Sequence, residues 1–339
     1  MKQLILLLIA CTILSCKSNK ELTLQSLNNS EKIEFTSSNL FPEGIAYWES
    51  KNKLILGSYG DGNIYAYDLK SNALTKLIED SLLIGPASIV IDNKTQIMYV
   101  ANGDAGVSNR SSISTINKSA SLIVYSLQTK KRIKYIDLKP LHTDSLSIAN
   151  GLTLDDLGNI YISDSYRPII YKVDNKTFEP SIFVEDKRFS GTNFNLNGIT
   201  YHPDGYLLAL QMGTGGLYKI NLKTKEIVAV QLQEKLIGAD GITLINKNQL
   251  LLTQAYEIEN KNYTTGALKI LQSSDNWNTS VVKDKKVTDC LNPTNSIKVN
   301  NHIYAINSSI GEYQFQGKNQ NQYSLIKLKL TPYNKVYSK

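Results

Sequence analysis

One short phrase recurs along this chain, and its opening residue repeatedly carries a side-chain oxygen atom. Four such residues, each followed by glycine, are Glu43, Asn150, Asn197 and Asp240. Clusters of carboxylate and amide oxygens bind hard divalent cations. If the fold brings the copies of the phrase to a common axis, these four side chains form a candidate metal site.

The spacing of the phrase indicates a repeat protein. Each copy is a turn residue followed by an alternating apolar run, and the copies begin at residues 43, 85, 150, 197, 240 and 292. Successive copies are therefore 42, 65, 47, 43 and 52 residues apart. Periods of roughly 40 to 50 residues are typical of β-propeller blades. The longest step contains the Ser-rich stretch 106–121, which we interpret as a loop inserted into the second blade and placed to act as a lid.

Each copy begins a module that is typical of four short strands separated by polar turns. In the first module we expect strands over 45–48, 53–57, 63–69 and 74–79. The last module supplies three strands, so the alternating segment 31–37 is expected to add the fourth and close the ring. The sequence therefore predicts an all-β fold, a six-bladed β-propeller over 31–330 with four antiparallel strands per blade. A C-terminal tail follows over 331–339.

In such a blade, the loop before the first strand and the loop between the second and third strands lie on the same face. The four donors therefore share that face with Tyr59, Asp61, Asn102, Asp104 and Tyr256. The residues expected there to contact substrate or to support the metal ligands are Asn150, Asp164, Tyr166, Arg167, Gln211 and Gln254.

A glycine follows each of the four donors, and we expect it to let the backbone turn sharply into the channel. Asn-Gly and Asp-Gly are also ordinary turn pairs, whose side chains bind nearby backbone groups. Four donors in the same phase of the repeat, two of them carboxylates, favour a metal site over four separate turns.

The phrases resemble those of the SMP-30/gluconolactonase family over roughly residues 31–330. The motifs that carry the resemblance are Pro42-Glu43-Gly44, Asn150-Gly151-Leu152, Asn197-Gly198-Ile199 and Asp240-Gly241-Ile242. The resemblance implies that Glu43, Asn197 and Asp240 ligate a divalent metal and that Asn150 contacts substrate or metal-bound water. It also implies hydrolysis of a small lactone or similar ester, with Asp240 as the catalytic base.

One position departs from the family pattern. The arginine that contacts substrate in characterised members lies two residues before the blade-three asparagine, and this chain has Ile148 there. Sugar-acid specificity is therefore not implied, although Arg167 on the neighbouring loop is a candidate replacement. We expect weak activity on gluconolactone and a preference for less anionic substrates.

The four oxygen donors include no sulfur or imidazole, so Ca²⁺ is the expected metal, with Zn²⁺, Mg²⁺ and Mn²⁺ as alternatives. The alternative function is a non-catalytic ligand-binding or scaffold propeller, because propellers serve both uses. A strictosidine synthase-like propeller is a third class, which the acidic and amide quartet disfavours.

The N-terminus is typical of a bacterial lipoprotein. Lys2 precedes the apolar run 4–9, and Leu14-Ser15-Cys16 resembles a lipobox. We expect a signal peptide over 1–15, lipidation of Cys16 and a tether over 16–30; a plain signal peptide is the alternative. The expected location is the cell envelope, with the protein anchored by lipid to the periplasmic or surface face of an outer membrane.

The remaining composition narrows the expected partners. The net charge of +7 comes from dispersed lysines, which argues against a nucleic-acid partner. Cys290 would be the single cysteine of the mature chain, expected as a buried apolar side chain. The expected partners are a small-molecule substrate and, through the lipid, a membrane.

Overall fold

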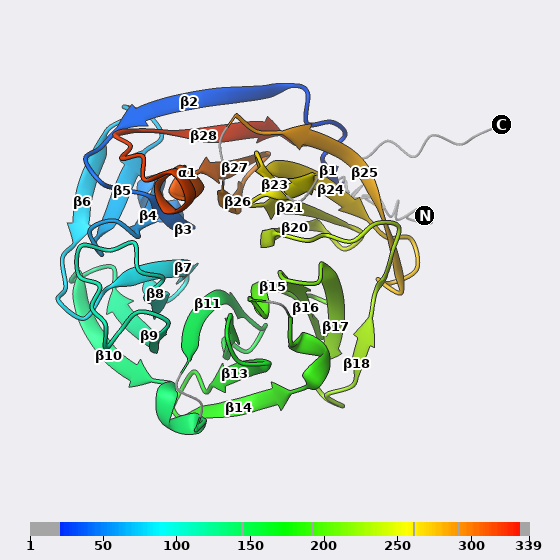
Figure 1. Cartoon of the computed structure of the whole chain (residues 1–339), viewed down its shortest axis with the longest axis horizontal. Coiled ribbons are helices and arrows are strands. Elements are labelled where there is room, and N and C mark those ends of the chain that lie inside the picture. The colour runs from blue at the N-terminus through cyan, green and yellow to red at the C-terminus, as the bar shows by residue number, and fades with distance from the viewer. Residues whose placement is uncertain (1–20, 144–145, 192, 260–261, 290–291, 333–339) are drawn as a thin grey trace, which may run out of the picture.

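The computed structural model describes residues 21–143, 146–191, 193–259, 262–289 and 292–332. Within these residues the chain is mostly β-strand, and the strands surround a central axis in a propeller-like ring (Figure 1). The predicted all-β, propeller-like class is therefore confirmed.

The first sheet follows the predicted module closely. Its strands β3 (Pro42–Trp48), β4 (Lys53–Ser58), β5 (Ile64–Asp68) and β6 (Leu74–Ile78) pair antiparallel in chain order. Between β3 and β4 lies the short 3₁₀ helix η1 (Glu49–Lys51), which ends at Asn52 with φ 52°. Asparagine adopts this left-handed conformation more readily than most residues, which favours a tight turn here.

The same antiparallel order recurs around the ring. The second run of strands is β7 (Gly85–Asp92), β8 (Ile97–Gly103), β9 (Lys118–Ser126) and β10 (Lys131–Asp137), and the third is β11 (Ser147–Leu154), β12 (Ile160–Asp164), β13 (Ile169–Val173) and β14 (Pro180–Glu185). The fourth run is β15 (Leu196–His202), β16 (Tyr206–Gln211), β17 (Gly216–Asn221) and β18 (Ile227–Ala229), and the fifth is β20 (Ala239–Asn246), β21 (Gln249–Gln254), β24 (Ala267–Gln272) and β25 (Thr279–Val287). The last run is β26 (Pro293–Val299), β27 (His302–Asn307) and β28 (Gln322–Lys329).

Two additions extend these sheets sideways. The short strand β19 (Gln231–Leu232) pairs in parallel with β25. Ser147 and Ile148 of β11 pair in parallel with Lys118 and Ser119 of β9, which joins β7–β10 and β11–β14 into one eight-stranded sheet.

The innermost strand of each run packs against the innermost strand of the next. Contacts pass from β3 to β7, β11, β15, β20 and β26, and from β26 back to β3. The strand predicted over 31–37 is β2 (Ser30–Thr36), which pairs with β28 along its whole length. The N-terminal strand thus completes the last sheet and joins the two ends of the ring (Figure 1).

The hydrophobic core lies between neighbouring sheets. Ile55 of the first sheet packs in one buried cluster with Met98 and Ile123 of the second. At the closure, Phe35 of β2 shares a buried cluster with Tyr67 of the first sheet. Interleaved apolar side chains of this kind, removed from water, provide the main stabilisation of the ring.

Residues 21–29, which fall within the tether expected over 16–30, pack against the ring. β1 (Leu22–Thr23) pairs with β29 (Thr331–Pro332). The Gln249 side chain accepts a hydrogen bond from the backbone N–H of Leu24 at 2.8 Å and donates one to its carbonyl at 3.0 Å. Leu24 and Leu27 are fully buried, so burial of these two leucines holds the segment on the body. The signal segment, Cys16 and Cys290 lie outside the described residues.

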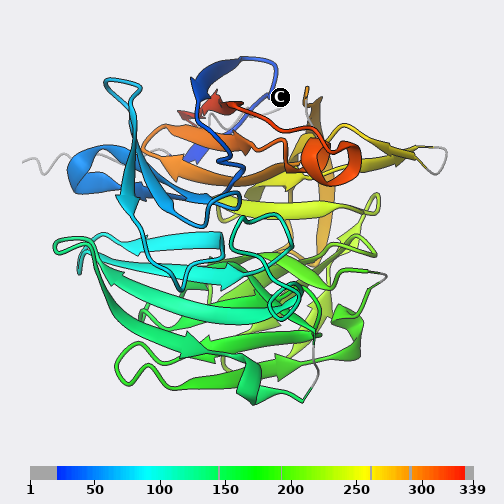
Figure 2. The ribbon, with the colours of Figure 1, turned by 60° about the vertical axis from the view of Figure 1, so that its left-hand side comes forward.

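The other short helices of the described chain also lie in connections: η2 (Lys139–Leu141), η3 (Lys187–Phe189) and α1 (Ile310–Gln316). Figure 2 shows α1 and the hairpin of β22 (Glu257–Glu259) and β23 (Asn262–Thr264) projecting from the same side of the ring. Among the described residues, no helix combines the length and apolar character needed to cross a membrane.

Candidate active site

Each innermost strand is irregular at the recurring phrase. In β3 the register with β4 shifts between Pro42 and Ile45, and in β20 the register with β21 shifts between Ala239 and Ile242. Shifts occur in the same region of β7, β11, β15 and β26. A β-bulge leaves its extra residue outside the ladder and redirects the side chain. The donors lie inside these irregularities, which frees them from regular pairing.

The glycine after each donor allows neighbouring strands to approach closely. A Cβ atom on Gly151 would lie 2.3 Å from the carbonyl oxygen of Asn197, and one on Gly198 would lie 2.4 Å from that of Asp240. None of the four donor-following glycines, all of which are described, has a positive φ. The expected sharp turn is therefore corrected: glycine is needed here because a larger residue would collide with the next innermost strand.

The four donors line one cavity of about 750 Å³. All of them are buried, with residue exposures of 5% for Glu43, 9% for Asn150, 5% for Asn197 and 3% for Asp240. We call these four residues the donor set. They come from β3, β11, β15 and β20, so the common axis required by the sequence argument exists in the fold.

Several oxygen atoms at this cavity have no hydrogen-bond partner. Asn150 Oδ1 and Asp240 Oδ1 are buried and unpartnered. The orientation of Asn150 is fixed by its Nδ2 atom, which donates to Ser165 Oγ at 3.0 Å. Asn292 also lines the cavity, and its Oδ1 atom is buried without a partner. Buried polar atoms are normally satisfied, so unpartnered oxygens facing one cavity indicate a site for a ligand.

The two buried carboxyl groups destabilise each other's charged forms. Burial, and after it the nearby Asp240, hold the pKa of Glu43 well above its ordinary value, against a weaker opposing hydrogen bond from Thr294. Burial raises the pKa of Asp240 to about 8, against the opposing effect of the Asn197 amide. Burial and the surrounding carboxyl groups also raise the pKa of Tyr59.

The donor chemistry fits a hard divalent cation. Among the described residues, no three or more His, Cys, Asp or Glu side chains gather as a metal-binding group. A cation here would therefore rely on two carboxylates together with amide oxygens, which Ca²⁺ accepts. Its charge would offset the repulsion between Glu43 and Asp240, and its coordination would satisfy the unpartnered oxygens.

Asp164, predicted to contact substrate, has a structural role instead. Its carboxylate accepts hydrogen bonds from Ser147 Oγ at 2.6 Å, from Tyr171 Oη at 2.9 Å and from the backbone N–H of Tyr166 at 2.9 Å. The backbone N–H groups of Ile148 and Arg167 donate to it as well, at 3.2 Å and 3.1 Å. Burial still raises its pKa, against these donors. Its oxygens hold the loop in place and do not line the cavity.

Arg167 and Tyr166 also lie outside the cavity lining. Arg167 is 1% exposed, and it donates from Nε to the carbonyl of Leu146 at 3.1 Å and from Nη1 to Tyr171 Oη at 3.2 Å. Its guanidinium is engaged inside the blade and does not line the cavity where the family arginine was expected. Tyr166 packs its ring 5.7 Å from that of Phe194, which does line the cavity.

Gln211 and Gln254, also predicted to contact substrate, lie outside the cavity lining as well. Gln211 donates to the carbonyl of Phe194 at 3.0 Å and accepts from the Thr214 hydroxyl at 2.6 Å. Gln254 donates to the carbonyl of Ile237 at 2.6 Å. Each sits at the end of the second strand of its run, beside the donor but turned toward loop backbone.

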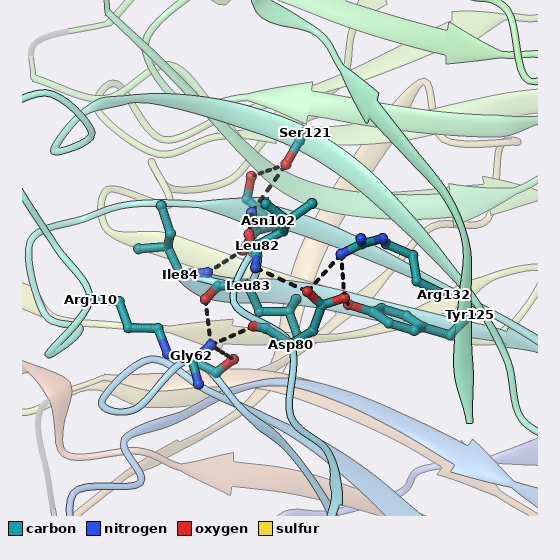
Figure 3. Close-up of polar contacts among 10 residues, drawn as sticks. All are labelled: Gly62, Asp80, Leu82, Leu83, Ile84, Asn102, Arg110, Ser121, Tyr125 and Arg132. Atoms are coloured by element: carbon teal, nitrogen blue, oxygen red, sulfur yellow. Dashed lines mark hydrogen bonds and ion pairs between the residues drawn. The ribbon is translucent and has the colours of Figure 1, made fainter.

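Asn102 occupies the equivalent position in the second run (Figure 3). Its Oδ1 atom accepts from the backbone N–H of Ile84 at 2.8 Å and of Gly85 at 3.2 Å. We call Asn102, Asp164, Gln211 and Gln254 the strand-end set. Its members share the mouth of the ring with the donor set, and they fasten the loops there.

The inserted loop predicted over 106–121 is anchored and not a free lid. Figure 3 shows Arg110 directed into the junction between the first two sheets, where its Nη1 atom donates to the carbonyls of Asp80 at 2.6 Å and Leu83 at 2.8 Å. The Asp80 carboxylate in turn binds Arg132 at 2.6 Å. Only the start of the loop, at Ala105 and Gly106, lines the cavity.

Sequence reasoning missed one wall of the cavity. Helix α1, between β27 and β28, contributes Ile310, Tyr313 and Gln314 to the lining. The apolar residues Phe194 and Met212 of the fourth run were missed as well. The unusually long link between the last two strands, with Ile310 and Tyr313 three residues apart, was the available signal for the helix.

Comparison with known proteins shows what this fold is similar to. No protein-family model matches the chain, and no curated protein matches its sequence. Among solved structures, the major allergen Mala s 1 of Malassezia sympodialis is 16% identical with a TM-score of 0.65, covering 91% of this chain and 99% of the allergen. A gluconolactonase from Xanthomonas campestris is 10% identical with a TM-score of 0.60, covering 92% and 94%. A luciferin-regenerating enzyme is 10% identical with a TM-score of 0.60, covering 89% and 98%. These likenesses establish a fold shared with gluconolactonase-like propellers.

Proposed function

We propose that this chain is a metal-dependent hydrolase that cleaves a small lactone or similar ester at the donor-lined cavity. The observation that carries the proposal is the convergence of the donor set on one cavity, with Asn150 Oδ1 and Asp240 Oδ1 buried and unpartnered. The gluconolactonase and the luciferin-regenerating enzyme of the same fold lend support to a hydrolase-type propeller.

The fold that holds this site is proposed to be a six-bladed propeller. Six innermost strands carry the irregular phrase, and each is followed by antiparallel pairing with the next strand of its run. The parallel pairing between β9 and β11 joins two of these units into one sheet without changing their order. Repetition at a period of roughly 40 to 50 residues supports the same assignment.

In this proposal Glu43, Asn197 and Asp240 hold a divalent cation, with Ca²⁺ favoured, and Asn150 contacts the substrate. The chemistry that such an ion supplies when bound is polarisation of the ester carbonyl. Asp240 takes a proton from the attacking water, which its carboxylate can do once the bound cation holds it in the ionised form. Tyr59 stays protonated at neutral pH and can donate a hydrogen bond in the cavity.

Two measurements test this function. Elemental analysis and calorimetry on protein that has been chelated and reloaded should give one divalent cation per chain, and Asp240→Ala should remove it. A panel of sugar, aliphatic and aryl lactones, followed by acid release, should reveal turnover that EDTA abolishes. If no lactone or ester is hydrolysed with Ca²⁺, Mg²⁺, Mn²⁺ or Zn²⁺ present, while a ligand still binds the cavity, the chain is a non-catalytic binding propeller.

We also propose that the protein is anchored in the cell envelope through a lipid on Cys16. The supporting observation is the path of the chain: Leu22 and Leu24 contact Asn246 and Gln249 in the turn between β20 and β21. That turn lies at the far end of β20 from Asp240, so the anchor would leave the ring on the face away from the donor set. Cys16→Ser should move the protein to the soluble fraction on cell fractionation. A wild-type protein that is already wholly soluble would refute the anchor.

A further inference from the structure

The lining of the cavity limits the charge of any ligand. All of its lining residues are described, and none is lysine, arginine or histidine. The ionisable residues among them are Glu43, Asp240 and three tyrosines. A bound divalent cation would carry a charge equal and opposite to that of the two carboxylates. No positive charge would then remain to compensate a carboxylate or phosphate on the substrate, and burying an uncompensated anion is strongly unfavourable.

One wall of the cavity is apolar and aromatic. Met212 and Tyr256 form a small buried cluster at the mouth, with Phe194 packed against it. This cluster is separate from those between the sheets. Met212, Tyr256 and Phe194 all line the cavity. Ile148, at the position of the family arginine, extends the apolar surface on β11.

A second apolar wall faces the first. Ile310 and Tyr59 belong to one buried cluster, with Tyr313 packed against it. Helix α1 carries two of these residues and lies across the ring axis from β15, which Phe194 closely precedes (Figure 1). Rings are well suited to such a space, because aromatic side chains pack on flat apolar groups by stacking or edge contacts.

We propose that the cavity selects an uncharged ester with an aromatic or alicyclic ring, of which a benzo-fused lactone is the model. The carbonyl end lies at the donor set, and the ring lies between the Phe194–Met212 wall and helix α1. This inference rests on the proposed function, and it adds the substrate class. A volume of about 750 Å³ accommodates a two-ring ligand with substituents.

The test separates binding from hydrolysis by pairing each lactone with a lactam that resists cleavage. The probes are dihydrocoumarin, its ring-carboxylated derivative, and the corresponding neutral and carboxylated dihydroquinolinones. Calorimetry with the metal-loaded wild-type protein should show the neutral lactam binding at least tenfold more tightly than the carboxylated one. Acid release should show kcat/KM for dihydrocoumarin at least tenfold above that for its carboxylated derivative and above that for gluconolactone.

The variant Ile148→Arg should reverse the order by restoring a positive charge, while the matched control Ile148→Met should keep it. Thermal unfolding and circular dichroism check that both variants fold; if the arginine variant does not, the wild-type comparison decides alone. Equal or tighter binding of the carboxylated lactam would overturn the substrate class. Tight binding of the neutral lactam without turnover of any lactone would keep the substrate class and reject the proposed hydrolysis.

Discussion

The donor set and the strand-end set contain the same kinds of side chain at the same mouth of the ring, yet the structure uses them differently. Asp240 and Asp164 show the contrast most clearly. Both are buried, and burial raises the pKa of both. Asp164 accepts five hydrogen bonds from the loop that follows it and from the neighbouring strands β11 and β13, whereas Asp240 Oδ1 accepts none.

The difference teaches how to tell a ligand site from a structural polar network. The side chains of the strand-end set form hydrogen bonds with loop backbone groups that have no strand partner and would otherwise need water. The donor residues lie in bulges, where the following glycine brings the next strand so close that backbone geometry is settled without the donor's side chain. Their oxygens remain available to a ligand. Residue type does not separate the sets. Asn150 and Asp240 keep unpartnered oxygens at the cavity, whereas in the strand-end set only Gln254 has one, at Oε1, and that residue lies outside the cavity lining.

The largest expected effect is on catalysis, from Asp240→Asn. The amide keeps an oxygen for the metal and removes the proton acceptor, so we expect turnover to fall by roughly 10²–10⁴-fold, the range for loss of a general base. Thermal unfolding should stay close to that of the wild type. Activity is measured by acid release on the best lactone of the panel, and residual activity within a few-fold of wild type would place the base elsewhere.

Asp164→Ala should have its main effect on stability. It leaves buried donors on Ser147, Tyr171 and three backbone N–H groups without an acceptor, so the free energy of unfolding should fall by roughly 3 kcal/mol or more. Urea titration measures this, with Asp164→Asn as a milder control that keeps the shape. A loss of turnover in fully folded Asp164→Ala, with stability unchanged, would show that Asp164 belongs functionally with the donor set.

Gly198→Ala tests the close approach of the innermost strands. Its Cβ atom would lie 2.4 Å from the carbonyl oxygen of Asp240, so we expect a loss of about 1–3 kcal/mol and weaker metal binding as Asp240 shifts. The matched control is Gly216→Ala, whose nearest neighbour is a ring carbon of Tyr218 at 3.1 Å. Equal unfolding midpoints for both variants would contradict the proposed role of the glycine.

A pH dependence of stability is also expected in the metal-free protein. Because the pKa of Asp240 rises from 3.8 to about 8 on folding, its protonated form favours the folded state. The contribution is complete below about pH 4 and declines as the pH rises toward 8. Thermal midpoints of EDTA-treated protein should therefore fall over this range, less so in Asp240→Asn. A wild-type profile identical to that of the variant would show that Asp240 titrates normally.

Metal affinity should change in the opposite direction over the same range. A cation competes with the proton on Asp240, so calorimetry should show binding that tightens as the pH rises from 5 to 8, and more proton release from the protein at pH 6 than an ordinary aspartate would give. Binding independent of pH between 5 and 8 would indicate that Asp240 is not a ligand.

The sequence by itself determined the repeat, the strand modules, the closing strand and the donor phrase. These features depend on local signals: alternating apolar residues, turn residues, and a glycine at a fixed place after each donor. Such signals repeat every blade, so an error in one copy is corrected by the others. Strands β4 and β6 accordingly lie within a residue of the predicted spans.

Only the tertiary structure decided which polar side chains face the cavity. Arg167 lies on a predicted loop and Gln211 lies at the end of β16, next to another. The loop backbone around them offers carbonyls and N–H groups that no strand satisfies, and their side chains bind those groups. Helix α1 supplies a cavity wall because the last blade leaves a long link between β27 and β28, whose position depends on closure of the ring by β2. Hydrogen-bond satisfaction and ring closure involve residues far apart in the chain, so the local pattern of one segment does not contain them.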